Sequence, residues 1–322
     1  MTNGVVADHD QQITDLYLAR ANRAFQNKPV AQVLERVKAI VGPANMPPIE
    51  QSKLAEEAMT RMQNGKKPTA KQLAALEFVI RLMRPVPLSR QGALDNLQPD
   101  VAPSFPDWST FQQSIKPHLY SIGRIDLLPK EGVGTGFLVS DSVLVTNKHV
   151  LDILSKGTGV LEKGQAIVRF KFEAGSADDE TPTSITGVVA VHDELDIALL
   201  KVAKQKFTKI RMPLTLDHTP VGVGDPVAAI GYPFDDSKRN PLFVSALFSG
   251  KFGVKRAAPG EVSDIGTRSI YHDCSTLGGN SGSPILSLKT ASVIGLHRDG
   301  YFLYRNEAVD GASLTKFVQS HL

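Results

Sequence analysis

The C-terminal two thirds of the chain consists of short apolar runs that are rich in β-branched residues and bounded by Gly, Asp or Pro. After Tyr120 these runs are GTGFLV, SVLVTN, AIVRFKF, SITGVVAV, DIALLKV, PVAAIGY, SPILSL and SVIGLH. Short strands at regular spacing, with turn residues between them, are typical of an all-β domain. The pattern therefore predicts a β-barrel or a β-sandwich for this part of the chain.

Residues 10–84 follow a different pattern, in which apolar side chains recur at helical spacing. Thr69 and Gln72 have the three-residue separation of a capping box, which marks a helix start, and Pro85 ends the last helical run. We therefore predict a bundle of four short amphipathic helices as a separate domain over residues 1–84. The apolar positions include Ile13, Leu16, Tyr17, Phe25, Val30, Val33, Leu34, Val37, Val41, Leu54, Ala58, Met59, Met62, Leu73, Leu76, Ile80 and Met83.

The segment between these two regions is rich in proline. Residues 85–106 contain five prolines together with Ser, Gln, Asn and Asp. Such a composition favours an extended, exposed linker. We therefore expect a domain boundary here, with the all-β domain over residues 107–322.

Composition and charge exclude several classes of protein. The formal net charge is +3 and no long basic run is present, so we expect neither nucleic acid nor a membrane as a partner. The single cysteine, Cys274, rules out an intramolecular disulfide. No stretch approaches 18 apolar residues, and the opening residues, with Asp8 and Asp10, do not resemble a secretion signal. We expect a cytoplasmic protein.

The motif GGNSGSP carries the strongest chemical signal. Two glycines precede Asn280 and one follows Ser281, which allows a tight, strained loop with an exposed hydroxyl. The amides of Gly279 and Ser281 can then point together at one oxygen. Ser283 also carries a hydroxyl but lacks the Gly-Asn approach. The alternative is an ordinary Gly/Ser turn.

A nucleophilic serine needs a base, and the base needs a group that orients it. The motif TNKHV places His149 just after the apolar run SVLV, and Asp196 precedes the apolar run IALLKV. Taken alone, a histidine at a strand end is more often structural, and an aspartate there is usually a solvated turn residue. On composition, Asp193 and Glu194 are rivals of Asp196.

Together, GGNSGSP, TNKHV and DIAL resemble the trypsin-fold (chymotrypsin-like) serine proteases, and most closely their bacterial glutamyl endopeptidase branch. The motifs stand in the order of that family, 47 residues from His149 to Asp196 and 85 from there to Ser281. The resemblance covers residues 107–322. It implies two six-stranded antiparallel β-barrels with a catalytic triad in the cleft between them, here preceded by the small helical bundle.

The resemblance implies a serine endopeptidase that acts on protein or peptide substrates through an acyl-enzyme. Ser281 attacks the peptide carbonyl, His149 accepts its proton, Asp196 orients the imidazole, and the amides of Gly279 and Ser281 bind the oxyanion. No metal or organic cofactor is required. Trypsin-like zymogens have an aspartate at the place of Asn280, which pairs with a freed amine. Because Asn280 is uncharged, we expect an oxyanion hole that does not depend on such a salt bridge.

The resemblance also places Thr276 and His297 where glutamyl endopeptidases hold an acidic side chain, and so implies a preference for Glu or Asp before the scissile bond. Alternatively, Thr276 is a packing residue and His297 a buried strand histidine, while Arg298 either adds charge or faces solvent. Those relatives also use a mature N-terminal amine near the pocket. Here about 106 residues precede the protease domain, so that contribution would require cleavage of the linker.

The helical module has three possible uses: recruiting an activating protein partner, covering the cleft as a prosegment, or serving as a structural cap. For the whole chain, one alternative is a Deg/HtrA-like quality-control protease. Only 41 residues follow Ser281, which is too few for a PDZ domain. The other alternative is a catalytically inactive binding scaffold on the same barrels.

Overall fold

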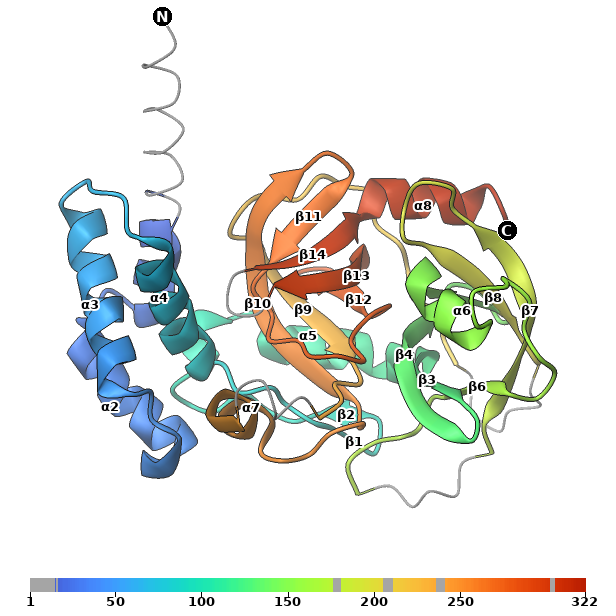
Figure 1. Ribbon diagram of the computed structural model, residues 1–322, viewed down its shortest axis with the longest axis horizontal. Coiled ribbons are helices and arrows are strands. Elements are labelled where there is room, and N and C mark those ends of the chain that lie inside the picture. Colours follow the sequence, from blue (N-terminus) through green and yellow to red (C-terminus); the bar gives the residue numbers. More distant parts are fainter. Residues whose placement is uncertain (1–14, 16, 176–180, 205–210, 236–240, 302–304) are drawn as a thin grey trace, which may run out of the picture.

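A computed structural model describes residues 15, 17–175, 181–204, 211–235, 241–301 and 305–322. The helices of the N-terminal region lie at one end of the molecule, the C-terminal barrel in the middle and the N-terminal barrel at the other end (Figure 1). Both barrels are closed and have six strands, as the resemblance implied. No helix in these ranges is long and apolar enough to cross a membrane.

The N-terminal region is helical, as predicted. Residues 17–25 are helical, and three further helices follow; the first 14 residues and Leu16 of the predicted bundle lie outside the described ranges. The capping box is present, because Gln72 N donates to Thr69 Oγ1 at 3.3 Å and Thr69 N donates to Gln72 Oε1 at 2.9 Å. The three further helices are α2 (Val30–Val41), α3 (Ile49–Gln63) and α4 (Ala70–Leu82).

The N-terminal barrel has the strand order β3-β4-β5-β8-β7-β6, with antiparallel neighbours throughout. Its core is formed by its own strands and by α6 (Lys148–Leu154), which follows β5 directly. The strands are β3 (Ile122–Leu127), β4 (Lys130–Leu138), β5 (Val143–Thr146), β6 (Ala166–Arg169), β7 (Thr183–Val191) and β8 (Ala198–Val202).

The C-terminal barrel has the order β10-β11-β14-β13-β12-β9, again antiparallel. Its apolar core is continuous with the helical region, since Phe78 and Val79 of α4 pack in one cluster with Val262 and Ile270 of the barrel. Helix α7 (Pro241–Phe248) joins this cluster. The other elements are β9 (Pro226–Gly231), β10 (Arg256–Gly266), β11 (Ser269–His272), β12 (Pro284–Ser287), β13 (Val293–Tyr301), β14 (Arg305–Asp310) and α8 (Gly311–Gln319).

Residues 85–106 were predicted to form an exposed linker, and the prediction of exposure is wrong. The segment lies against the C-terminal barrel, where Ser89 N donates to Lys255 O at 2.9 Å and Ala257 N donates to Pro87 O at 3.0 Å. Proline indicated an extended backbone, but the apolar residues between the prolines bury their side chains. These buried residues are Val86, Leu88, Leu94, Leu97, Val101 and Phe105.

Short elements connect this segment to the first barrel. A two-stranded hairpin, β1 with β2, is followed by a helix that buries Trp108 and Phe111 under the barrels. The elements are β1 (Ser89–Arg90), β2 (Ala93–Leu94), η2 (Ala102–Ser104), α5 (Trp108–Ile115) and η3 (Lys116–Ser121); η1 (Pro43–Asn45) lies earlier, between α2 and α3.

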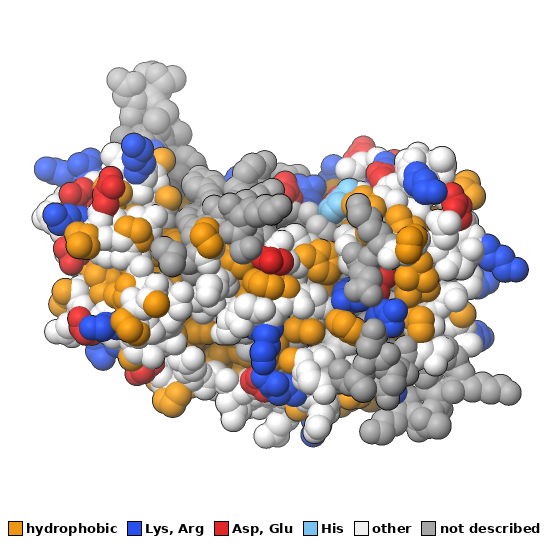
Figure 2. All heavy atoms as spheres, turned by 60° about the horizontal axis from the view of Figure 1, so that its bottom comes forward, with side chains coloured by type: hydrophobic (Ala, Val, Ile, Leu, Met, Phe, Trp, Pro, Cys, Tyr) orange, Lys and Arg blue, Asp and Glu red, His pale blue; other side chains and the backbone are white. Residues whose placement is uncertain are grey.

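Buried ion pairs also join the helical region to the C-terminal barrel. Arg20 Nε donates to Asp273 Oδ2 at 2.9 Å, and Arg84 pairs with both Asp273 and Glu261. Asp273 follows β11 and begins the segment that leads to Ser281. Because these groups are buried, their mutual attraction is only weakly screened, and it fixes the helices against this segment. On the face shown in Figure 2, charged side chains of both signs are interspersed.

Candidate active site

The loop that carries Ser281 lies between β11 and β12 and contacts both barrels. Its Ser281 carbonyl accepts from Thr135 N of β4 at 2.8 Å, and Gly282 N donates to His297 O of β13 at 3.0 Å. Gly279 and Gly282 have φ values of +88° and +85°, which glycine adopts without strain. A side chain on Gly282 would also place its Cβ 2.0 Å from Thr135 O, so the loop can approach β4 only with glycine there.

The amides beside the serine hydroxyl are available to a ligand. In the described part of the chain, the N–H groups of Gly279 and Ser281 have no acceptor. The buried Asn280 side chain stabilises the loop itself, since its Oδ1 accepts from Leu277 N at 3.2 Å. The uncharged Asn280 thus has a partner within the loop, and independence from a freed amine stays a prediction.

The structure brings His149 and Asp196 together. His149 lies in the first turn of α6, and Asp196 just before β8, which pairs with β5. Asp196 accepts two hydrogen bonds from the histidine, from Nδ1 to Oδ2 at 2.7 Å and from the amide N to Oδ1 at 3.0 Å. Asn147 Nδ2 donates to Asp196 O at 2.9 Å, which fixes the two segments against each other.

Asp196 and its neighbour Glu194 have different partners. Burial raises the pKa of Asp196, but the hydrogen bonds from His149 outweigh it, so its pKa lies below the ordinary value. A carboxylate that stays ionised beside the imidazole holds its tautomer and stabilises an imidazolium. Glu194 is exposed and pairs instead with Arg268, at 2.7 Å.

Ser281 lies next to the segment that carries His149, although no hydrogen bond joins the two side chains in the structure. A Cβ built on Gly134 would lie 2.9 Å from Val150 Cγ2 and 3.1 Å from Ser281 O, so the serine backbone and the neighbour of His149 face the same point of β4. The hydrogen bond between a nucleophile and its base is often long before substrate binds and shortens in the complex. The backbone of Ser281 thus lies beside the segment of the N-terminal barrel that carries His149, and the role of the three residues as a catalytic triad stays a prediction.

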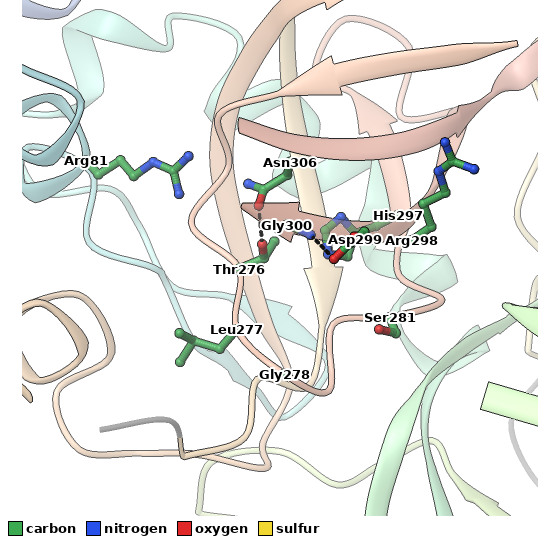
Figure 3. A pocket seen from close by; sticks show the side chains of 10 residues that line it. All are labelled: Arg81, Thr276, Leu277, Gly278, Ser281, His297, Arg298, Asp299, Gly300 and Asn306. Carbon is green, nitrogen blue, oxygen red and sulfur yellow. Dashed lines mark hydrogen bonds between the residues drawn. The ribbon is translucent and has the colours of Figure 1, made fainter. Parts of the chain in front are cut away.

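A pocket of about 160 Å³ opens beside Ser281 (Figure 3). Thr276 and His297, the two residues expected to bind substrate, both line it. Thr276 Oγ1 donates to Asn306 Oδ1 at 3.0 Å, and Asn306 Nδ2 donates to Cys274 O at 2.6 Å. The pocket wall is thus polar and ordered by hydrogen bonds.

Two histidines meet at this wall, with His297 lining the pocket and His272 behind it. His272 Nε2 and His297 Nδ1 are 3.2 Å apart and both side chains are buried. Burial lowers the pKa of His297 to about 4, and burial followed by the proximity of His297 lowers that of His272 well below its ordinary value. Both imidazoles are therefore neutral near pH 7, and His297 contributes hydrogen bonding rather than charge to the pocket.

Sequence reasoning missed Arg81, His272 and Asn306 as residues of this site. Arg81 belongs to α4 and yet lines the pocket. One local signal existed: Glu77 and Arg81 are a charged pair four residues apart on an otherwise apolar helical stretch, which favours burial of the pair. His272 and Asn306 had no comparable signal in their local sequence.

The residues that the structure describes contain no group of three or more His, Cys, Asp or Glu side chains that could hold a metal ion. Cys274 is buried, and burial raises the pKa of its thiol far above the ordinary value, so it is a packed side chain rather than a reactive one.

Several curated proteins are similar to the chain. The "Putative protease Do-like 3, mitochondrial" of Arabidopsis thaliana is 29% identical over 178 residues, which cover 55% of this chain and 27% of the relative. A glutamyl endopeptidase of Staphylococcus epidermidis is 27% identical over 196 residues, 59% of this chain and 61% of the relative. The chain thus spans less than two thirds of the length of these relatives.

Among solved structures, a serine endoprotease from Yersinia pestis is 18% identical, with a TM-score of 0.47 and 65% of each chain covered. The model of the trypsin-like peptidase domain matches residues 134–296, just over half of the chain. This range includes His149, Asp196 and Ser281 as well as the N-terminal barrel from β4 onward. The chain therefore belongs to the trypsin-like peptidase family.

Proposed function

We propose that this protein is a serine endopeptidase with Ser281 as nucleophile, His149 as general base and Asp196 as the group that orients His149. The observation that carries the proposal is the pair of hydrogen bonds from His149 to Asp196, formed beside the part of β4 that the serine loop contacts. Membership of the trypsin-like peptidase family supports the same assignment.

In the proposed reaction, Ser281 Oγ attacks the peptide carbonyl while His149 Nε2 accepts the hydroxyl proton. The free amides of Gly279 and Ser281 bind the oxyanion, and each such donor stabilises a transition state by roughly 3–4 kcal/mol. His149 then gives the proton to the leaving amine, and water hydrolyses the acyl-enzyme by the same route.

We further propose that the peptidase prefers Glu or Asp before the scissile bond. The support is the polar wall of the pocket, where the neutral His297 offers a ring N–H close to Ser281 and the Thr276 hydroxyl, which donates to Asn306 Oδ1, keeps the wall polar. A buried carboxylate needs hydrogen-bond donors to replace its hydration, and an apolar side chain would leave these groups unpaired. The relatives named glutamyl endopeptidase favour the same specificity.

We also propose that the N-terminal helices form a structural part of the peptidase. The shared apolar core and the buried pairs of Arg20 and Arg84 with Asp273 favour a permanent cap over a removable prosegment. Recruitment of an activating partner through the outer faces of α2 and α3 is compatible with this role.

The experiment that tests the catalytic assignment is labelling with a fluorophosphonate probe. The wild-type chain should be labelled and Ser281→Ala should not. Ser283→Ala is the matched control, because Ser283 is a buried serine of the same loop and its loss should leave labelling intact. Labelling that persists in Ser281→Ala, or disappears equally in Ser283→Ala, would show that Ser281 is not the nucleophile.

Specificity is tested with peptides that differ only in Glu, Gln, Lys or Leu before the scissile bond. A preference for Lys or Leu would exclude the proposed specificity for Glu or Asp. The likeness to a Do-like protease favours a second candidate, a quality-control protease. Broad cleavage of an unfolded protein without preference for Glu would support it.

A further inference from the structure

Arg81 is a buried arginine that the proposed mechanism does not use. It belongs to α4, is 2% exposed and lines the pocket beside Ser281. Figure 3 shows its side chain extending from the helix toward Thr276 and Asn306. Its Nε donates to Glu77 Oε1 at 2.7 Å, whereas its Nη2 is buried and has no partner among the described residues. A buried donor without an acceptor is costly unless a ligand supplies one.

The carboxylates near Arg81 are shared among several arginines. Glu77 pairs with both Arg81 and Arg20, while Asp273 and Glu261 pair with Arg84. Arg23 also pairs with Glu261, but its side chain is half-exposed and solvated. Each carboxylate of the network is therefore already engaged, and none accepts from Arg81 Nη2.

The other charged groups at the pocket do not replace Arg81. Arg298 pairs with Glu307 and so is largely neutralised. His297 is uncharged near neutral pH because of its burial. Asp299 is exposed on the pocket rim, where its Oδ1 accepts from Gly300 N at 2.7 Å. Arg81 is thus the pocket cation that combines burial with an unused donor.

We propose that the guanidinium group of Arg81 binds the carboxylate of the substrate side chain before the scissile bond. The inference rests on the proposed peptidase function and names the positive charge with which the pocket would bind an acidic substrate side chain. A guanidinium suits this purpose because it stays ionised when buried and offers donors in a fixed plane. The substrate class is a peptide with Glu or Asp at that position.

The N-terminal helices then take part in specificity as well as in packing. Arg81 is more than 190 residues away from Thr276 and Ser281 in sequence, and only the docking of α4 on the C-terminal barrel brings it to the pocket. Cutting the chain between the helices and the barrels, with loss of the helices, would remove this charge.

The test compares kcat/KM for two peptides that differ only in Glu or Gln before the scissile bond, using full-length protein. We expect Arg81→Met to lower the value for Glu by roughly 10- to 100-fold and to change that for Gln by less than about threefold. The Glu-to-Gln ratio does not depend on the fraction of folded protein, so reduced stability cannot imitate this result.

Arg84→Met is the matched control, because Arg84 is a buried arginine of the same ion network that does not line the pocket. It should lower stability and leave the Glu-to-Gln ratio within about threefold of wild type. Equal ratios in wild type and Arg81→Met, or equal changes in Arg81→Met and Arg84→Met, would overturn the proposal. If Arg81→Met does not fold, Arg81→Gln serves instead, with the same expected and contradicting ratios.

Failure of the proposed function is distinguishable from failure of this inference. A wild-type chain that takes no fluorophosphonate label and cleaves neither peptide would overturn both. A labelled wild type that cleaves both peptides equally would overturn the role of Arg81 and leave the peptidase assignment standing. Partial recovery of the ratio in Arg81→Lys, which keeps the charge but not the planar donors, would support the role.

Discussion

Each barrel buries an aspartate between two arginines, but the arginines come from different parts of the molecule. In the N-terminal barrel, Asp126 of β3 accepts from Arg124 of the same strand at 2.8 Å and from Arg169 of β6 at 3.0 Å. In the C-terminal barrel, Asp273 pairs with Arg20 and Arg84, both from the N-terminal region. The first barrel neutralises its buried charge itself, whereas the second depends on the helices.

The apolar cores repeat this difference. The cluster inside the N-terminal barrel consists of its own strands and α6, while that of the C-terminal barrel continues into α2, α3 and α4. A third cluster joins the two barrels to each other, with α5 and α8. The proposed base and its aspartate thus lie on a barrel whose inner core does not involve α2, α3 and α4, and the serine loop and the pocket lie on the barrel that packs against them. The proposed catalytic pair is held within its own barrel, whereas the pocket also depends on the helices.

The largest expected effect tests whether the two barrels form one catalytic centre. Ser281→Ala and His149→Ala should each lower kcat on the order of 10⁶-fold, and Asp196→Asn roughly 10⁴-fold, because the three groups act as a unit. Peptide hydrolysis at matched active-site concentration measures this. If the double variant lost the product of the single losses, the residues would be acting independently and the shared centre would be refuted.

Removal of the helices should destabilise the C-terminal barrel more than the N-terminal barrel. A fragment of residues 107–322 leaves Asp273 and Glu261 without Arg20 and Arg84, and exposes the apolar surface that α4 covers. Each uncompensated buried charge destabilises by about 3–5 kcal/mol, so we expect the C-terminal barrel to unfold or aggregate. Hydrogen exchange should show loss of protection in β9–β14 before β3–β8. A fragment as stable as the full chain would contradict the comparison.

Substitution of a single buried arginine should cause a smaller loss of stability than removal of the helices. Arg20→Met leaves Asp273 and Glu77 short of one buried cation, and should lower the free energy of unfolding by about 3–5 kcal/mol. Arg23 is the control: it binds Glu261 from the same helix, but its side chain is 51% exposed. Arg23→Met should therefore lower that free energy by less than about 1 kcal/mol. Denaturant unfolding monitored at equilibrium compares the two, and similar losses would argue against a buried network.

The smallest expected effect is the pH dependence of stability. The pKa of His297 is about 4 in the folded chain against 6.5 as its ordinary value. The unfolded chain therefore binds a proton between pH 6.5 and pH 4 that the folded chain does not, and stability falls as the pH is lowered through this window. Two and a half pH units correspond to roughly 3 kcal/mol. His297→Gln should remove this part of the dependence, and an unchanged pH profile in that variant would refute the buried neutral state.

At pH values below this window, the loss of stability should come from protonation of Asp273. Burial raises the pKa of Asp273, but Arg84 and Arg20 outweigh it and hold that pKa well below the ordinary value of 3.8. Its contribution to stability is thus present above pH 3.8 and is lost only as the pH falls further. The two windows distinguish the pocket histidine from the ion network of the helices.

Much of the protein was predictable from the sequence because its signals are local. The apolar runs predicted an all-β domain, the resemblance of GGNSGSP, TNKHV and DIAL to a known family implied two six-stranded barrels, and Thr69 with Gln72 predicted a capping box; all three are present. Strands and caps depend on residues a few positions apart, so their patterns survive in the linear sequence. The roles of Thr276 and His297 in substrate binding stay predictions, although both residues line the pocket.

The sequence by itself determined where the chain turns, where its strands lie and which serine stands on a glycine-rich loop, because those features depend on backbone preferences and nearest neighbours. Only the tertiary structure decided that the proline-rich segment is buried, that Arg20 meets Asp273 across 253 residues, and that Arg81 reaches the pocket. The physical reason is that burial and ion pairing are properties of surfaces that meet after folding, and no period or motif in the chain records which surfaces those are.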